Sequence, residues 1–337
     1  MSLVEKIIVY FVTMNTFRTV IDTPQSSFQI DHQRKLLLMG SCFAENIGET
    51  LEKYKFPITY NPFGIIYNPI SVKNSLELLI KQKKFTKTNL IQTSGLWTSF
   101  SHHSKFSSSN LNECLEIINN SIISSSNHLK KTDYLFITLG SSYVYKYKKT
   151  GKIVSNCHKI PAKEFERYRL SVSEIIKEYD QLIKKLRSYN KKLKLIFTVS
   201  PIRHWKDGAI DNQISKSILL VAIDELKSKH NHVEYFPAYE IMMDELRDYR
   251  FYAVDMLHPS QTAINFIWEK FKETYINEKS YNILNDLNKL NSAIDHRPFN
   301  PKSEAHIKFK KRQLDFIKEL SRKLPNADFE KDIHHFT

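Results

Sequence analysis

Two adjacent residues near the amino end of the chain carry nucleophilic groups, the hydroxyl of Ser41 and the thiol of Cys42. They follow Gly40 and the apolar run Lys35–Met39, and a helical pattern begins directly after them. Open α/β sheets hold their ligands in turns at the carboxyl ends of strands. Only seven of the 337 residues are glycine, which favours a role at Gly40 that only glycine can fill. We therefore predict a catalytic turn with either Ser41 or Cys42 as nucleophile.

A second group, Asp255 and His258 followed by Pro259, could activate that nucleophile. Because proline suits the first turn of a helix, we expect His258 at the amino end of the helix that follows. The helix dipole disfavours a protonated imidazole there, which leaves the ring able to accept a proton. Asp255 can bind the other ring nitrogen and orient the ring. An ordinary surface histidine before a capped helix is the competing interpretation.

These two groups need a scaffold that brings them together, and the hydrophobic pattern predicts one. Four apolar runs are typical of core strands, namely Lys35–Met39, Tyr134–Leu139, Leu193–Val199 and, more weakly, His232–Phe236. Helical patterns alternate with them, at Phe43–Tyr54, Val72–Lys83, Leu111–His128, Ala162–Ser188, Gln213–His230 and Thr262–Ile276. This alternation predicts an α/β fold with a parallel sheet covered by helices on both faces.

Other segments depart from this alternation. Residues 91–109 are expected to form short extended structure and loop, and residues 143–161 a hairpin excursion. Residues 278–323 are polar and helical, and Arg297–Pro301 divides them because its prolines restrict the backbone. The end of the chain, from Asn326, is expected to be frayed.

The composition limits the class of protein. Hydrophobic residues make up 41% of the chain, enough for a substantial core, and no stretch approaches the roughly 18 apolar residues of a membrane span. The apolar segment Ile7–Met14 lacks the cleavage site of a secretory signal, and Met14 is a candidate start. Three cysteines without a disulfide framework favour a reducing cytoplasm. Without a CxxC or HExxH motif, we expect no metal and no cofactor.

The net charge of +14 would in principle favour acidic partners. However, the lysines are spread over many predicted helices, and no recognisable nucleic-acid-binding motif accompanies them. We therefore expect a solvated basic surface and no nucleic-acid partner. The sequence leaves the oligomeric state open.

The two chemical groups, in this order along the chain, resemble those of the SGNH (GDSL-like) hydrolases. More narrowly, Gly40-Ser41-Cys42-Phe43-Ala44 matches the motif that names the GSCFA domain family. Further stretches resemble the same family, at residues 61–69, 156–161, 200–205 and 249–253. The resemblance covers most of residues 35–275 and implies a three-layer α/β/α, flavodoxin-like sheet.

The resemblance also implies roles for individual residues. Laid without a gap on the Gly-Asp-Ser-Leu motif of the hydrolases, Cys42 occupies the serine position, whereas a shift of one residue places Ser41 there. Gly64 corresponds to an oxyanion-hole glycine, and Gly140 opens the third motif of the superfamily. That motif usually contains an asparagine where this chain has Ser142, so the usual side-chain oxyanion donor is missing.

Further polar residues could complete the site. Asn156, like Ser142, is a candidate substitute for the missing donor, and it forms an unusual Asn-Cys-His stretch with His158. Arg203 and His204 follow a predicted strand and face the same end of the sheet as Gly40. Arg203 could bind an anionic group of a substrate in a bidentate manner, or could pair with a structural carboxylate.

We therefore expect an SGNH-like esterase or O-acyltransferase that acts on an acyl ester, with acetylated carbohydrates among the candidates. Ser41 or Cys42 attacks the acyl carbonyl, His258 takes the proton and Asp255 orients His258. The alternative is a catalytically silent binding protein of the same fold for a sugar or an acidic ligand. The expected division of the chain is an N-terminal extension (1–30), an SGNH-like domain (31–278) and a C-terminal helical extension (279–337).

Overall fold

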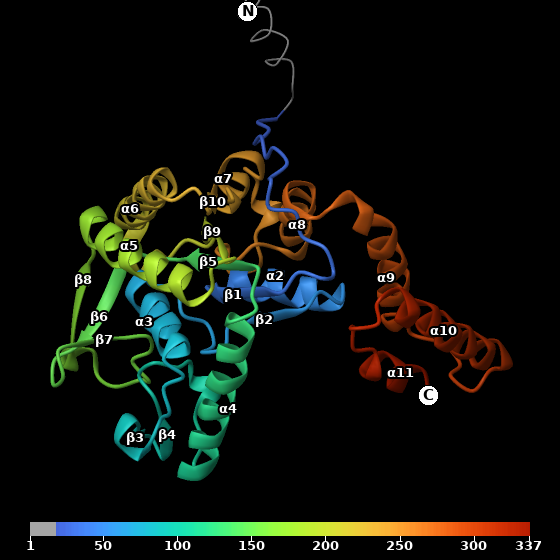
Figure 1. Ribbon diagram of the computed structural model, residues 1–337, viewed down its shortest axis with the longest axis horizontal. Helices are drawn as coiled ribbons and strands as arrows, with labels where there is room; N and C mark the ends of the chain where they lie inside the picture. The colour runs from blue at the N-terminus through green and yellow to red at the C-terminus, as the bar shows by residue number, and fades with distance from the viewer. Residues whose placement is uncertain (1–17) are drawn as a thin grey trace, which may run out of the picture.

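A parallel five-stranded sheet forms the centre of the protein in the computed structural model, which describes residues 18–337 (Figure 1). Its strands are β1 (Leu36–Gly40), β2 (Ile58–Tyr60), β5 (Tyr134–Leu139), β9 (Lys194–Val199) and β10 (Val233–Tyr235). All neighbouring pairs are parallel, so the predicted α/β fold is confirmed. The short, half-buried strand β2 was not predicted.

The strands lie side by side in the order β10-β9-β5-β1-β2. Numbered along the chain, the order from the β2 edge is 2-1-3-4-5, which is the flavodoxin-like order. The connections therefore change direction between β1 and β5. The crevice at the carboxyl ends of these two strands is the standard ligand position of such a sheet.

Alternate residues of each strand enter two separate cores, because successive side chains point to opposite faces. Leu37 and Met39 of β1 pack on the face covered by four helices, α3 (Pro69–Ile80), α4 (Leu111–Leu129), α5 (Val172–Tyr189) and α6 (Gly208–Lys229). Leu36 and Leu38 pack on the opposite face, under α2 (Cys42–Lys53) and α8 (Gln261–Tyr275). The result is a sheet between two helical layers.

Helices α2 and α8 both begin at the carboxyl edge of the sheet. Helix α2 follows the last residue of β1 after Ser41 alone. Helix α8 ends at the opposite edge, because Ile276, which follows it, forms a parallel bridge with Ile30, shortly before β1 starts. The amino ends of the two helices therefore lie at the same edge.

A small antiparallel sheet stands beside the central one, formed by β6 (Tyr143–Tyr147), β7 (Lys152–Val154) and β8 (Phe165–Arg169). Strands β6 and β7 form the predicted hairpin. The predicted helix over Ala162–Ser188 is wrong in its first part, since β8 pairs with β6 and α5 begins only at Val172. The ring of Phe165 packs 5.3 Å from that of Tyr147, and this tertiary contact favours the strand.

The remaining predictions concern the ends of the chain and the segment before α4. Strands β3 (Ile91–Thr93) and β4 (Leu96–Thr98) confirm the expected extended structure. Residues 1–17, and with them the candidate start at Met14, lie outside the described residues. The described part of the predicted N-terminal extension contributes Phe28 and Ile30 to the core under α2 and α8.

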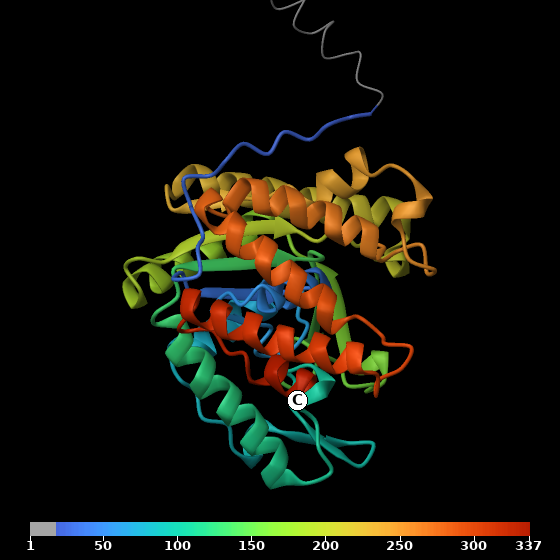
Figure 2. The ribbon, with the colours of Figure 1, turned by 90° about the vertical axis from the view of Figure 1, so that its right-hand side faces the viewer.

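Three helices follow the sheet domain, α9 (Tyr281–Ile294), α10 (Glu304–Lys323) and α11 (Glu330–Phe336). Figure 1 shows them, in orange to red, beside that domain, and in Figure 2 they lie in front of it. The break between α9 and α10 contains Arg297–Pro301, as predicted. The predicted fraying from Asn326 is wrong, because Phe329 and Phe336 are buried in a cluster with residues of α9 and α10.

Candidate functional site

The turn after β1 is held rigidly by its neighbours. Gly40 has a φ of +140°, and a Cβ at this position would lie 2.1 Å from the carbonyl oxygen of Thr138. Its N–H donates to Oδ1 of Asn61 at 2.9 Å, and the N–H of Ser41 donates to Thr138 O at 3.2 Å. The backbone of β5 therefore approaches so closely that only glycine fits.

Ser41 and Cys42 have different surroundings in this turn. Ser41 is 4% exposed and caps α2, with its Oγ accepting the N–H of Phe43 at 3.2 Å. Cys42 is the first residue of α2 and is partly exposed, with a free thiol. Burial raises the pKa of that thiol, while nearby N–H groups and the charge of Lys216 lower it. The Ser41 hydroxyl is thus occupied as a helix cap, whereas Cys42 is partly exposed and its thiol is free.

Asp255 and His258 form the predicted pair. Nδ1 of His258 lies 2.6 Å from Oδ2 of Asp255, and Oδ1 of Asp255 accepts the backbone N–H groups of Leu257 and His258 at 2.9 Å each. These backbone bonds, followed by the imidazole, lower the pKa of Asp255 to about 2. Both side chains are about half exposed. Within residues 18–337, no hydrogen bond joins His258 to Ser41 or Cys42.

The predicted place of Pro259 in the first turn of the following helix is wrong, because α8 begins at Gln261. Ser260 is the N-cap of α8, and its Oγ accepts the N–H of Ala263. Pro259 therefore precedes the cap instead of occupying the first helical turn, and it bridges to Tyr252. His258 lies outside the helix, so the carboxylate of Asp255 orients it more directly than the helix dipole does.

The amides of the two predicted glycines already have partners within the fold. The N–H of Gly64 donates to Asn61 O at 2.7 Å, and the N–H of Gly140 donates to Tyr67 O at 2.8 Å. A Cβ at Gly64 would lie 2.2 Å from Cβ of His103, so this position also needs glycine for close packing. In this conformation both amides hold loops at the carboxyl edge.

Ser142, which stands where an asparagine was expected, belongs to a closed network. It is fully buried, and its N–H and hydroxyl both donate to Oγ of Ser215, at 2.8 and 3.0 Å. Ser141 Oγ lies 3.2 Å from the same Ser215 oxygen. The network ties the loop after β5 to helix α6.

Asn156 and His158 connect two loops. Oδ1 of Asn156 accepts the N–H of His158 at 2.9 Å, and the imidazole of His158 lies within hydrogen-bond distance of Thr98 Oγ1 and Ser99 O. Burial lowers the pKa of His158. The pair therefore fixes the segment after β7 against the β3–β4 hairpin.

Arg203 and His204 do lie at the carboxyl edge, after β9. Nε of Arg203 donates to Oδ1 of Asn212 at 3.3 Å. The ring of His204 stacks on Tyr67 at 4.9 Å, and burial lowers its pKa to about 4. Tyr67 in turn covers Gly140, whose Cβ would lie 2.9 Å from the Cβ of Tyr67. This group joins the loops after β2, β5 and β9.

The sequence prediction missed Lys216 of α6. It is fully buried, and its Nζ donates to Ser200 O at 2.7 Å, directly after β9. Among residues 18–337 it forms no ion pair with a carboxylate. Burial lowers its pKa to about 7, while Cys42 raises it and Arg203 lowers it further. Its helical spacing from apolar residues could have indicated that Lys216 is buried. The buried residues of α6 are Asn212, Ser215, Lys216, Leu219, Ala222, Ile223 and Leu226.

Asn61 is a second residue that the prediction did not single out as functional. Its Oδ1 supports Gly40, but its Nδ2 is buried and has no hydrogen-bond partner among the described residues. The side chain is 2% exposed and follows β2, next to the turn after β1. The Asn61 side chain, which binds Gly40, therefore offers an unused N–H donor at the turn after β1.

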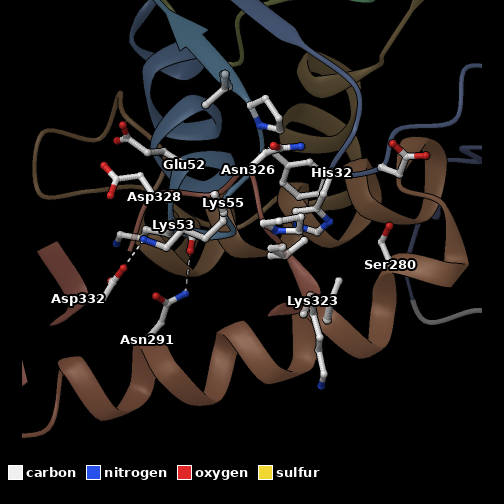
Figure 3. Close-up of a pocket in the computed structure, with 18 of the residues that line it drawn as sticks. His32, Glu52, Lys53, Lys55, Ser280, Asn291, Lys323, Asn326, Asp328 and Asp332 are labelled. Atoms are coloured by element: carbon white, nitrogen blue, oxygen red, sulfur yellow. Dashed lines mark hydrogen bonds and ion pairs between the residues drawn. The ribbon is translucent and has the colours of Figure 1, made fainter. Parts of the chain in front are cut away.

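A cavity of about 730 Å³ lies elsewhere, between the amino edge of the sheet and the C-terminal helices (Figure 3). Lys55 and Asp332 form an ion pair at its wall, and Nδ2 of Asn291 donates to Lys53 O at 3.4 Å. The lining contains both lysines and carboxylates, and none of the predicted site residues. We therefore treat it as separate from the site at the carboxyl edge.

Comparison with family models identifies the chain. The GSCFA family model matches residues 35–271, most of the sheet domain. The chain belongs to the GSCFA family. The model of the C-terminal domain of GSCFA domain proteins matches residues 287–337, which include α10 and α11. No curated protein is significantly similar to this GSCFA protein in sequence.

Two solved structures are similar to the GSCFA protein. One is a Streptococcus pneumonia protein provisionally described as a platelet activating factor. It is 14% identical in sequence, the match covers 80% of this chain and 91% of that chain, and the TM-score is 0.37. The other is the family 3 carbohydrate esterase of Clostridium thermocellum, with 12% identity, 75% and 98% covered, and a TM-score of 0.31.

No helix between residues 18 and 337 is long and apolar enough to cross a membrane. Over the same residues, no cluster of three or more His, Cys, Asp or Glu side chains could hold a metal ion.

Proposed function

We propose that this GSCFA protein hydrolyses or transfers acyl esters, with Cys42 as nucleophile and the Asp255–His258 pair in acid–base catalysis. The observation that carries the proposal is the 2.6 Å bond between Nδ1 of His258 and Oδ2 of Asp255. A bond of this kind fixes the ring and leaves Nε2 to exchange protons. Helices α2 and α8 start at the same edge of the sheet. This supports a site in which Cys42, at the start of α2, lies near the Asp255–His258 pair, which precedes α8.

Cys42 is favoured over Ser41 because it is partly exposed whereas Ser41 is buried, and because it is the first residue of α2. The N–H of a residue at that position has no partner within the helix, and it can donate to an oxyanion. Nδ2 of Asn61 is a second donor without a partner among the described residues. Together they would replace the asparagine that this chain lacks after Gly140.

The reaction would proceed in two steps. The sulfur of Cys42 bonds to the acyl carbon as its proton passes to a base, and the ester C–O bond breaks as the alcohol oxygen takes up that proton. Water or a sugar hydroxyl then attacks the thioester and loses its proton to His258, and the C–S bond breaks. The displaced Cys42 sulfur takes up a proton as His258 releases the one it accepted. No cofactor takes part in this scheme.

Acetylated carbohydrates are the substrate class to assay first. Trp205 is 49% exposed and follows β9, which ends at the carboxyl edge. Tyr249 is 79% exposed and lies three residues before Tyr252, which bridges to Pro259. Exposed aromatic rings suit the apolar faces of sugars. The test is to incubate the full chain with p-nitrophenyl acetate and with acetylated sugars, and to measure acetate release against the Cys42→Ala variant. Equal release by both proteins would overturn the proposal.

A catalytically silent binding protein is the second candidate. The bonds already made by the amides of Gly64 and Gly140 favour it, because neither amide is free for an oxyanion. This alternative predicts calorimetrically detectable binding of an acetylated sugar without release of acetate. Release of acetate that depends on Cys42 would exclude it.

A further inference from the structure

The least expected side chain at the carboxyl edge is the buried amine of Lys216. Lysine is almost never fully buried without a paired charge, because removing an ammonium from water is costly. Here the side chain is 0% exposed, and the carbonyl oxygen of Ser200 is its one hydrogen-bond acceptor among the described residues. An arrangement of this kind favours a neutral amine, which is a base.

The amine lies at the carboxyl edge of the sheet, as the candidate nucleophile does. Long side chains in a helix lean toward the amino end of that helix, and α6 starts after β9, at the carboxyl edge. Ser200, which accepts the bond from Lys216, donates its own N–H to Leu139 O at the end of β5. Thr138 of β5 binds the backbone of Ser41. One backbone network therefore connects the Lys216 site with the turn that carries Cys42.

We infer that Lys216 is the base that takes the proton from the Cys42 thiol, directly or through one water, while His258 acts on the attacking water or alcohol. The inference rests on the proposed function for the acyl chemistry, and it names the base of the first step, for which the sequence had suggested His258. The S–H proton moves to Nζ as the S–C bond forms. It then moves to the leaving oxygen as the ester C–O bond breaks.

The pKa shifts of Cys42 and Lys216 agree with a role of Lys216 as the base for the thiol. Burial raises the pKa of the Cys42 thiol, so the resting thiol keeps its proton and needs a base. Burial lowers the pKa of Lys216 to about 7, so much of the amine is neutral at neutral pH. The titratable or charged groups that influence or face Lys216 are Cys42, Arg203, His204 and Tyr239. The pKa of His204 is lowered to about 4, so His204 adds no charge near pH 7.

The test is the rate at which iodoacetamide alkylates Cys42 in the full chain between pH 6 and 9, measured by peptide mass spectrometry. Cys157, which is also partly exposed, is the internal reference in every sample. The variant is Lys216→Met, because methionine is apolar and similar in length. Exposed Lys227 of the same helix supplies the matched control, Lys227→Met. Circular dichroism checks that both variants fold.

In the wild type and in Lys227→Met, alkylation of Cys42 should rise with pH through about 7, as Lys216 loses its proton. In Lys216→Met the rate of Cys42 alkylation at pH 7.5 should fall by about tenfold or more, because the thiol loses its base. One pKa unit corresponds to a tenfold change. His258→Ala should leave this rate unchanged. An unchanged profile in folded Lys216→Met would overturn the inference, and so would a loss of the rate in His258→Ala.

If Lys216→Met does not fold, a second measurement on the wild type tests the inference. In the wild type, prior alkylation of Cys42 should change the titration of Lys216 that is followed by NMR of the lysine side chain, and an unchanged titration would overturn the inference. Neither measurement uses an ester. A failure of the acyl chemistry would instead appear as the absence of an acyl group on Cys42, whatever the profile of Lys216→Met.

Discussion

Nδ1 of His258 lies 2.6 Å from Oδ2 of Asp255, and the other oxygen of the same carboxylate holds two backbone N–H groups of the loop. One carboxylate therefore fixes both the ring and the backbone that carries it. This geometry, formed by residues only three positions apart, underlies the first two predictions.

Replacement of His258 by alanine should reduce ester turnover by about a hundredfold or more, because general acid–base catalysis typically contributes 10²–10⁴-fold. The thioester on Cys42 should persist longer in the variant, since its hydrolysis needs the base. Rapid-quench mass spectrometry measures both effects. His334→Ala, at an exposed position in α11, is the matched control. Turnover by His258→Ala at the wild-type rate would remove this residue from the mechanism.

The carboxylate of Asp255 should stay ionised at pH 3, where an ordinary aspartate is mostly protonated. Its pKa is lowered in the folded protein to about 2, so its support of the loop is present above the unfolded pKa. That support is lost as the pH falls through about 2. Carboxyl ¹³C NMR between pH 3 and 6 measures the ionisation. If the Asp255 carboxyl titrated with a midpoint near 4, the backbone bonds would not have the role given to them. The variant His258→Ala keeps both backbone N–H groups and serves as the control.

Gly40→Ala should destabilise the protein by more than about 3 kcal/mol, since the new methyl group would overlap the backbone of β5. Its Cβ would lie 2.1 Å from Thr138 O. Gly151→Ala is the control, because Gly151 also has a positive φ but no atom within 4 Å of the new Cβ. It should cost about 1 kcal/mol. Urea unfolding measures both, and equal losses would argue against a close approach at Gly40.

Phe336→Ala should destabilise the C-terminal helices by about 3 kcal/mol, the usual cost of removing a buried aromatic ring. The ring is 3% exposed, whereas Ile333 of the same helix is 43% exposed and supplies the control Ile333→Ala. The measurement is the rate at which a protease cleaves the chain between α10 and α11, which should rise as α11 detaches. Equal cleavage of both variants would mean that α11 does not pack as described.

Much of the sheet could be predicted because its strands are buried on both faces and therefore appear as continuous apolar runs. Strand β2 could not, since it has three half-buried residues and no such run. Strand β8 was taken for helix because its pairing with β6 is a tertiary effect. The helix α11 was missed because its burial depends on contacts with α9 and α10, which no local pattern encodes.

The candidate site was predictable where neighbouring residues carry it. Gly40, Ser41 and Cys42 lie on one turn, and Asp255 and His258 on one loop, so spacing alone indicated both groups. Lys216 was missed because a lysine is normally read as a surface residue, although its helical spacing from Leu219 and Ile223 places it on the buried stripe. The bonds that occupy the amides of Gly64 and Gly140 depend on loop conformations that sequence does not specify.

The identity of the nucleophile tests the account most directly. We would incubate the wild type, Cys42→Ala and Ser41→Ala with p-nitrophenyl acetate, quench with acid, and map the acetyl group by peptide mass spectrometry. The account predicts acetyl on Cys42 in the wild type and in Ser41→Ala, which loses only an N-cap worth about 1 kcal/mol, and none in Cys42→Ala. Acetyl on Ser41, or turnover by Cys42→Ala at the wild-type rate, would contradict it.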